Sequence, residues 1–144
     1  MFNFFMIPRK KRTTPVHHVK VLPNSVHTWR GQHWSWVRKL EATKGDGLRI
    51  IRNLKKILEV HARGIAEKRM NSRKLYIQAF EIEKLLSEMT DEVLMAEGKI
   101  PRDIPVDANY GDLWNQYYIN ALRHFWPQFS PELKKEMLKQ IRHE

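Results

Sequence analysis

The sequence predicts an all-α protein, and three features of the chain support this prediction. Two long stretches in the middle of its 144 residues carry apolar side chains at spacings of three and four, the repeat of a helix with one buried face. A third helical stretch, rich in aromatic residues, follows a proline-rich link. No stretch shows the alternating pattern of a half-buried strand. At this length we expect one core at most.

Residues 1–44 are expected to form an extended basic arm, because prolines punctuate it and a glycine-rich turn signal ends it. Its first forty residues contain no acid. Their cations are Arg9, Lys10, Lys11, Arg12, Lys20, Arg30, Arg38 and Lys39. These eight account for most of the formal net charge of +10, so the charge is concentrated in the arm. A charge of this sign favours a polyanionic partner, nucleic acid first and an anionic membrane surface second.

A long helical hairpin is expected over residues 45–98. Its first helix is predicted from about 47 to 69 with Asp46 as N-cap, and its second from about 73 to 97, followed by Gly98. Asn71 and Ser72 supply the turn and N-cap between them, and so short a connection makes the helices antiparallel. The apolar faces comprise Ile50, Ile51, Leu54, Ile57, Leu58, His61 and Ile65 in the first helix, and Leu75, Ala79, Ile82, Leu86, Met89 and Val93 in the second.

Residues 99–144 are expected to form a proline-rich link and two shorter helices. One helix is predicted from about 110 to 126, and the other begins after Ser130 as N-cap, with Pro131 in its first position. The first of these helices carries the aromatic residues Trp114, Tyr117, Tyr118, Phe125 and Trp126. Five large rings exceed what one helix face buries, so we expect most of them in the core and part of them at an interface with a neighbouring protein.

The first long helix carries a row of cations that suits contact with a phosphate backbone. Arg49, Arg52, Lys56 and Arg63 fall within about 60° of one another on a helical wheel. The row points away from the apolar stripe, so one side of the helix can pack while the other meets phosphates. The alternative is an ordinary solvated face.

Tryptophans and cations are interleaved at the end of the arm. The tryptophans are Trp29, Trp34 and Trp36, and the cations among them are Arg30, Arg38 and Lys39. Such rings and guanidinium groups suit stacking on unpaired bases and contact with phosphate. The alternative is that the rings cover the hairpin, which we expect of at least one of them.

No pattern of catalytic or metal-binding residues is found in the sequence. There is no cysteine, and the histidines lack the companions that a ligand set or general base requires. We expect His61 to be a hydrogen-bonded core residue and the acids Glu81, Glu83, Asp91 and Glu92 to be exposed. No apolar run reaches the roughly 18 residues of a membrane span. The expected protein is therefore not an enzyme, with no cofactor, no metal and no transmembrane span.

A scattered set of residues in the hairpin follows the pattern of a known family. The set comprises Leu40, Asp46, Leu48, Leu54, Leu58, Glu59, Asn71-Ser72-Arg73-Lys74-Leu75, Ile82, Lys84 and Leu85. The pattern resembles ribosomal large-subunit protein twenty-nine, in particular its mitochondrial form, over residues 34–90. Trp34 and Trp36 lie near the position where mitochondrial members carry a tryptophan. The resemblance implies helices that lie against ribosomal RNA on the large subunit, and it leaves residues 98–144 without a counterpart.

Taken together, these features predict a structural constituent of a ribosome, most plausibly in the mitochondrial matrix and otherwise in the cytoplasm. Its expected partners are ribosomal RNA, through the basic arm and the basic helix face, and neighbouring ribosomal proteins, through the aromatic set. The alternative is an accessory helical subunit of a mitochondrial inner-membrane respiratory or ATP synthase complex, in which the arm lies over protein or anionic lipid.

Overall fold

The described part of the chain consists of helices around one core, which confirms the all-α prediction. A computed structural model describes residues 36–103 and 111–141, and these contain no strand. The helices are α1 (Trp36–Ala42), α2 (Gly45–Ala66), α3 (Ser72–Ala96), α4 (Gly111–Phe125) and α5 (Pro131–Ile141), with a 3-10 helix at Trp126–Gln128. None of the described helices is both long and apolar enough to cross a bilayer.

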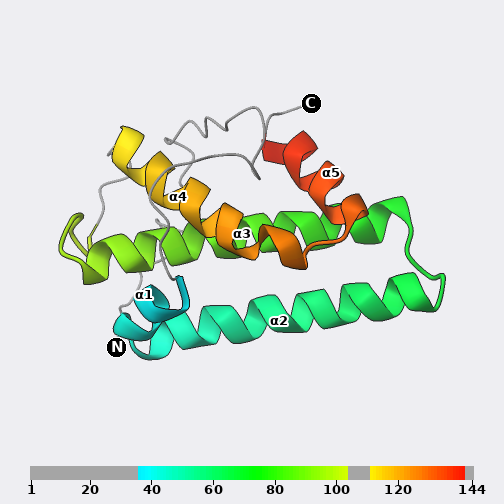
Figure 1. The fold of residues 1–144 in the computed structure, drawn as a ribbon, viewed down its shortest axis with the longest axis horizontal. Helices are drawn as coiled ribbons and strands as arrows, with labels where there is room; N and C mark the ends of the chain where they lie inside the picture. Colours follow the sequence, from blue (N-terminus) through cyan, green and yellow to red (C-terminus); the bar gives the residue numbers. More distant parts are fainter. Residues whose placement is uncertain (1–35, 104–110, 142–144) are drawn as a thin grey trace.

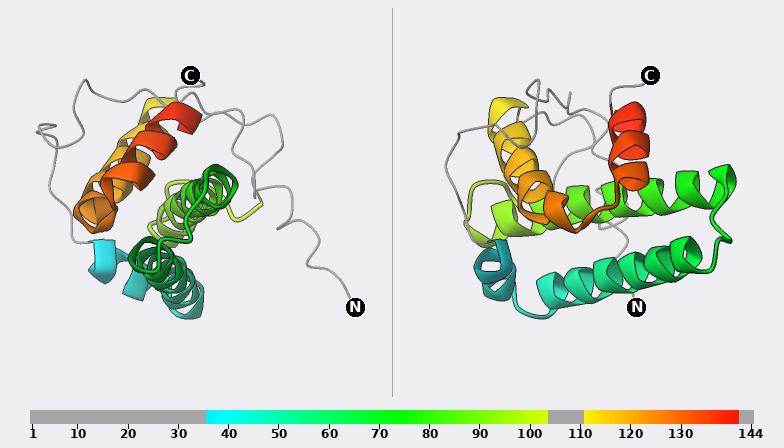
Figure 2. Two further views of the ribbon diagram at one scale, coloured as in Figure 1. Left: turned by 90° about the vertical axis from the view of Figure 1, so that its right-hand side faces the viewer. Right: turned by 45° about the vertical axis from the view of Figure 1, so that its right-hand side comes forward.

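Helix α3 is the central element of the fold. It contacts α1, α2, α4 and α5. Helices α2 and α3 run side by side in opposite directions, and α4 and α5 cover the side of α3 that faces away from α2 (Figure 1). The end-on view in Figure 2 places α3 between α2 and the α4–α5 pair. One face of α2 therefore packs on α3 and the opposite face is left uncovered by the other helices.

The apolar faces predicted for the two long helices lie in this core. On α3, every residue of the predicted seam except the half-buried Leu75 is fully buried. On α2, Ile50, Leu54 and His61 are buried, whereas Ile65 near the end of the helix is exposed. The helical repeat in the sequence thus identified the inner faces, because burial of an amphipathic stripe supplies most of the stability of such helices.

Helix α1 shows that the prediction of an extended arm through residue 44 is wrong at its end. Trp36 and Leu40 lie one turn apart on the same face of α1, and neither has any exposed surface. The chain is helical from Trp36 to Ala42, and this helix buries both side chains against the rest of the fold. Residues 1–35 of the predicted arm lie outside the described residues.

The helix ends agree with most of the capping residues predicted from the sequence. Asn71 Oδ1 accepts the Lys74 N–H at 2.9 Å, and Ser130 Oγ accepts the Leu133 N–H at 3.1 Å, so both N-caps are confirmed. Gly98 follows α3 with φ 72°, the left-handed conformation expected there. Asp46 is not the N-cap of α2, because the helix begins at Gly45 and Asp46 lies in its first turn. Its charge is favourable there near the positive end of the helix dipole.

The aromatic set of α4 lies entirely within the core, so the expectation of a protein interface there is wrong. Trp114, Tyr117, Tyr118, Phe125 and Trp126 are all buried. Four of these rings lie on α4, and Trp126 lies in the 3-10 helix that follows it. Trp114 stacks on Tyr118 at 5.2 Å between ring centroids, and Trp126 meets Phe129 edge to face at 5.9 Å.

The acids of α3 were expected to be exposed, and this is wrong for Asp91 and Glu92, which are buried. Helix α4 covers the C-terminal half of α3, where these two acids lie, and its aromatic side chains carry N–H and O–H groups that need acceptors. The indole N–H of Trp114 donates to Asp91 Oδ1 at 2.8 Å. The hydroxyl of Tyr118 donates to Glu83 at 3.3 Å, and burial raises the pKa of Tyr118 well above its usual value. Glu81 is exposed, as expected.

Candidate nucleic-acid interface

The structure describes seven of the fifteen residues predicted to bind RNA. Trp36, Arg38 and Lys39 lie on α1, and Arg49, Arg52, Lys56 and Arg63 lie on α2. The other eight lie outside the described residues: Arg9, Lys10, Lys11, Arg12, Lys20, Trp29, Arg30 and Trp34. Helices α1 and α2 contact each other, so the chain that leads from the arm joins the fold at the beginning of α2.

Three cations of α2 form an exposed row along the outer side of the helix. Arg52, Lys56 and Arg63 are exposed, and within the described ranges none of them makes an ion pair. Arg63 lies eleven positions after Arg52, and each position adds a helical rise of about 1.5 Å, so the row is about 16 Å long. It lies on the side of α2 away from the buried stripe, and two of its members, Lys56 and Arg63, also reach the rim of an open groove beside α3. We call these three residues the basic row.

Two exposed residues beside the basic row were not among those predicted for the RNA interface. Lys55 is also exposed and lies three residues after Arg52, so it widens the row. Its spacing could have identified it from the sequence alone. Glu59 is exposed as well and stands between Lys56 and Arg63. A single acid reduces the local positive potential without reversing it.

Arg49 differs from the rest of the predicted row. Its Nη2 donates to Glu88 Oε2 on α3 at 2.8 Å. This hydrogen bond, together with the Glu88 charge, raises the pKa of Arg49 above its usual value. Arg49 is exposed, as predicted, but its charge is paired with Glu88, so it links α2 to α3 and is not an unpaired cation of the row. A helical wheel of α2 could not predict this ion pair, because the pair depends on how α3 is positioned along α2 and hence on where Glu88 lies.

Trp36 is part of the core and is not available for stacking on a base. Its ring has no exposed surface and meets Tyr117 of α4 edge to face, with 6.3 Å between the ring centroids. The prediction that Trp36 binds RNA is therefore wrong. The expectation that at least one of the three tryptophans folds back onto the body is confirmed, because Trp36 joins α1 to α4.

Lys39 belongs to a cluster at the end of α3 and is not a free cation. Glu97 pairs with Lys39 and also accepts the hydroxyl hydrogen of Tyr117. Lys99 Nζ donates to the Tyr117 hydroxyl at 2.7 Å. Burial acts to raise the pKa of Glu97, but the hydrogen bonds from Lys39 and Tyr117 outweigh it and hold that pKa below its usual value. Arg38, in contrast, is exposed.

The low pKa of Glu97 predicts a pH-dependent contribution to stability. A carboxyl group with a lowered folded-state pKa stabilises the fold above its unfolded pKa of about 4.3, and this is lost as the pH falls through the folded value. We expect Glu97→Gln to lower the free energy of unfolding at pH 7 by less than about 1 kcal/mol, since the group is partly exposed. Urea unfolding should show that this difference from the wild type shrinks as the pH falls below the unfolded pKa and is lost once the pH has passed the folded one. Glu41→Gln, a change at an exposed acid of α1, is the control; an equal effect of both changes would contradict the assignment.

The histidines and acids of the described residues are the side chains that could act as metal ligands. Among them, no group of three or more His, Asp and Glu residues is placed to hold a metal ion. His61 is buried, with Nδ1 2.7 Å from Gln78 Oε1 and Nε2 2.7 Å from Ser130 Oγ. A neutral ring with the proton on Nδ1 donates to Gln78 and accepts from Ser130. This confirms the prediction of a hydrogen-bonded core histidine.

Comparison of the chain with protein-family models, with curated proteins and with solved structures found no match. The resemblance to ribosomal protein twenty-nine therefore stays a prediction. Function is inferred below from the residues of this chain alone, and chiefly from the basic row of α2.

Proposed function

We propose that the protein binds RNA as a non-catalytic structural component of a ribonucleoprotein particle, with a mitochondrial ribosome in the matrix as the first candidate. The observation that carries this proposal is the basic row of α2. Arg52, Lys56 and Arg63 are exposed, lie along one face and form no ion pair in the part of the chain that the structure describes. Cations placed in this way neutralise phosphates and release counterions, which is the main source of affinity that does not depend on sequence.

The proposed binding mode uses a hairpin of α2 and α3 and the basic arm together. Helix α3 covers the inner side of α2, and Arg49 ties the two helices together through Glu88. This support fixes the orientation of the basic row. Six further cations precede residue 36, where the arm meets the fold. Two basic elements can then contact two stretches of one RNA backbone, which raises affinity without base-specific contacts.

A salt titration of RNA binding tests the proposal. For the full chain and a single-stranded RNA of about 20 nucleotides, we expect log K to fall with log salt with a slope steeper than about −2. In the triple variant Arg52→Gln, Lys56→Gln and Arg63→Gln, each lost phosphate contact should make the slope shallower by about 0.7. We expect the affinity of the triple variant for this RNA at about 0.1 M salt to be at least tenfold lower than that of the wild type.

The matched control removes the same charge elsewhere, in the triple variant Arg102→Gln, Lys135→Gln and Lys139→Gln. These three cations are also exposed and make no ion pair among the described residues. Equal weakening by the two triple variants, or a wild-type slope shallower than about −2, would contradict the proposed interface. In the native particle, loss of the protein after nuclease treatment supports RNA binding. Retention supports the alternative of an accessory subunit held by protein or lipid.

A further inference from the structure

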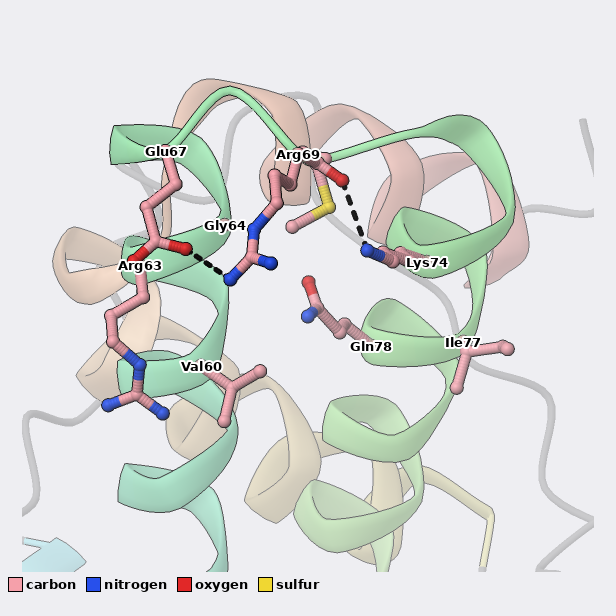
Figure 3. Close-up of a pocket in the computed structure, with 9 residues that line it drawn as sticks. Val60, Arg63, Gly64, Glu67, Arg69, Lys74, Ile77 and Gln78 are labelled. Carbon is pink, nitrogen blue, oxygen red and sulfur yellow. Dashed lines mark hydrogen bonds and ion pairs between the residues drawn. The ribbon is translucent and has the colours of Figure 1, made fainter.

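An open groove separates α2 from α3 near the connection between them. Two adjoining hollows of about 440 Å³ and about 240 Å³ share Val60, Ile77 and Gln78 in their walls. Figure 3 looks into the larger hollow, with Val60 on α2, Ile77 on α3 and Arg69 near the connection between the two helices. The lining on this side extends from Lys56 on α2 to Glu67, the C-cap of that helix, which is about 16 Å or three helical turns.

Large apolar side chains in and beside this groove are left exposed. Val60 is 50% exposed and Ile77 is 47% exposed, and Phe80 and Tyr76 next to Ile77 are similarly uncovered. The side of the groove that faces α5 is closed, because His61 bonds both Gln78 and Ser130. Exposed apolar residues gathered along one groove mark an interaction surface, whereas isolated ones do not.

Cations flank the apolar residues on both walls of the groove. On α2, Lys56 and Arg63 lie one turn before and one turn after Val60. On α3, Arg73 and Lys84 stand one turn before and two turns after Ile77. Among the residues that line the two hollows, four cations face two acids: the cations are Lys56, Arg63, Arg69 and Lys74, and the acids are Glu67 and Glu81. Glu67 is already paired with Arg69. The groove is therefore apolar at its centre and positive along its rim.

A polar donor is placed at the floor of the groove. Gln78 Oε1 accepts a hydrogen bond from His61 Nδ1, so the amide is held in one orientation. Figure 3 shows that the Gln78 amide points into the space between the two helices. Its N–H groups can donate to a carboxylate or a carbonyl oxygen of a molecule in the groove.

We propose that this groove binds an acidic amphipathic helix of a protein partner, about three turns long. Apolar anchors at spacings of three and four would contact Val60 and Ile77, and Asp or Glu on the flanks of that helix would meet the cations of the rim. The length of the groove exceeds what a single base fills. A second copy of this chain is a poor fit, because a two-fold contact would bring two positive rims together. This inference goes beyond RNA binding, although Lys56 and Arg63 contribute to both surfaces.

A model peptide tests the proposal on the full chain. The probe is a fluorescent peptide of about 18 residues, long enough to form a helix, with Leu at spacings of three and four and Glu on both flanks. Fluorescence anisotropy should show binding at least tenfold tighter than that of a scrambled peptide of the same composition. A peptide with Lys in place of Glu should not bind. Equal binding of the ordered and scrambled peptides would overturn the proposal, because it would show charge attraction alone.

Variants of the groove provide the second arm of the test. Val60→Asp and Ile77→Asp should each weaken peptide binding at least tenfold, with unchanged helicity because both side chains are half exposed. The matched control is Leu48→Asp, a change at a 42% exposed apolar residue of α2 outside the groove, which should leave binding within twofold. An unchanged affinity in the groove variants would overturn the proposal.

Two other occupants would be recognised in the same experiments. If Ile77→Asp, a change on α3 and not on the helix of the basic row, weakens RNA binding as much as the triple variant of the basic row, the groove belongs to the RNA surface and the proposal is wrong. If sedimentation shows a dimer that Val60→Asp dissociates, the occupant is a second copy and the proposal is equally wrong. If the salt titration shows that the basic row does not bind RNA, the peptide result still stands. It is read from variants of Val60 and Ile77, which carry no charge and are not part of the basic row.

Discussion

Replacing Trp114 by alanine is expected to lower the free energy of unfolding by about 3–5 kcal/mol, the usual cost of removing a buried tryptophan. Trp114 has no exposed surface and stacks on Tyr118. Its indole N–H is also a donor to the buried carboxylate of Asp91. The substitution therefore leaves a cavity between α3 and α4 and removes a hydrogen bond from the buried carboxyl group of Asp91 at the same time.

Trp114→Phe separates these two contributions. Phenylalanine preserves most of the stacking surface on Tyr118 but cannot donate to Asp91, so we expect a loss of about 1–3 kcal/mol. Urea unfolding followed by far-ultraviolet circular dichroism measures both variants without relying on the fluorescence of the deleted ring. A cost for Trp114→Ala no larger than that for Trp114→Phe would show that the cavity collapses and that packing of α4 on α3 contributes little.

The elements that could be predicted from the sequence are those set by local rules. The spacing of apolar residues identified the inner faces of α2 and α3, since a stripe along a helix is buried wherever the helix packs. Asn71 and Ser130 were identifiable as N-caps because the cap uses the residue's own side chain and a backbone N–H three residues later. These features depend on few distant contacts, and the structure contains all of them.

The features that could not be predicted depend on contacts between distant segments. Asp91 looks like an exposed acid until α4 places the Trp114 indole against it. Arg49 fits the outer row on a wheel, yet the register of α3 brings Glu88 within its reach. The sequence around Trp36 is compatible with RNA binding and with a place in the core. The contact between its ring and Tyr117 shows that it belongs to the core. Of the described residues of the predicted interface, Arg38 and the three cations of the basic row are exposed, and the row has no ion-pair partner among the described residues.

The open groove and the basic row have a common structural cause. Helix α4 covers the C-terminal half of α3, and α5 covers one side of its N-terminal half. No described helix covers the other side of that half or the outer face of α2. Apolar side chains such as Ile77 and cations such as Arg63 are therefore exposed at the same end of the molecule. A partner that contacts this end of the molecule can touch both the groove and the basic row. The two proposals therefore need variants that change the groove without changing the basic row, and the reverse.

Gly47→Ala is expected to destabilise the protein by about 3 kcal/mol, at the upper end of the cost of overpacking. Gly47 is buried in the first turn of α2, beneath α1. A Cβ atom there would lie 2.9 Å from the carbonyl carbon of Leu40 and closer still to that carbonyl oxygen and to Thr43 Oγ1. Two of these three atoms belong to the backbone, and the Thr43 hydroxyl is held by its hydrogen bond to Leu40 O. Relief therefore requires α1 to move away from α2, and Trp36 and Leu40 would lose their packing with it.

Gly45→Ala is a matched control two residues away. Nothing lies within 4 Å of a Cβ atom at Gly45, so alanine should stabilise the helix by up to about 1 kcal/mol through the lower entropy of the unfolded chain. Opposite signs for two identical substitutions in one helical turn would isolate the steric contact with α1, since helix propensity acts in the same direction at both positions. Thermal and urea unfolding measure both variants. If Gly47→Ala were neutral, α1 would not be seated on α2 as described, and the path of the chain from the arm to the basic row would have to differ.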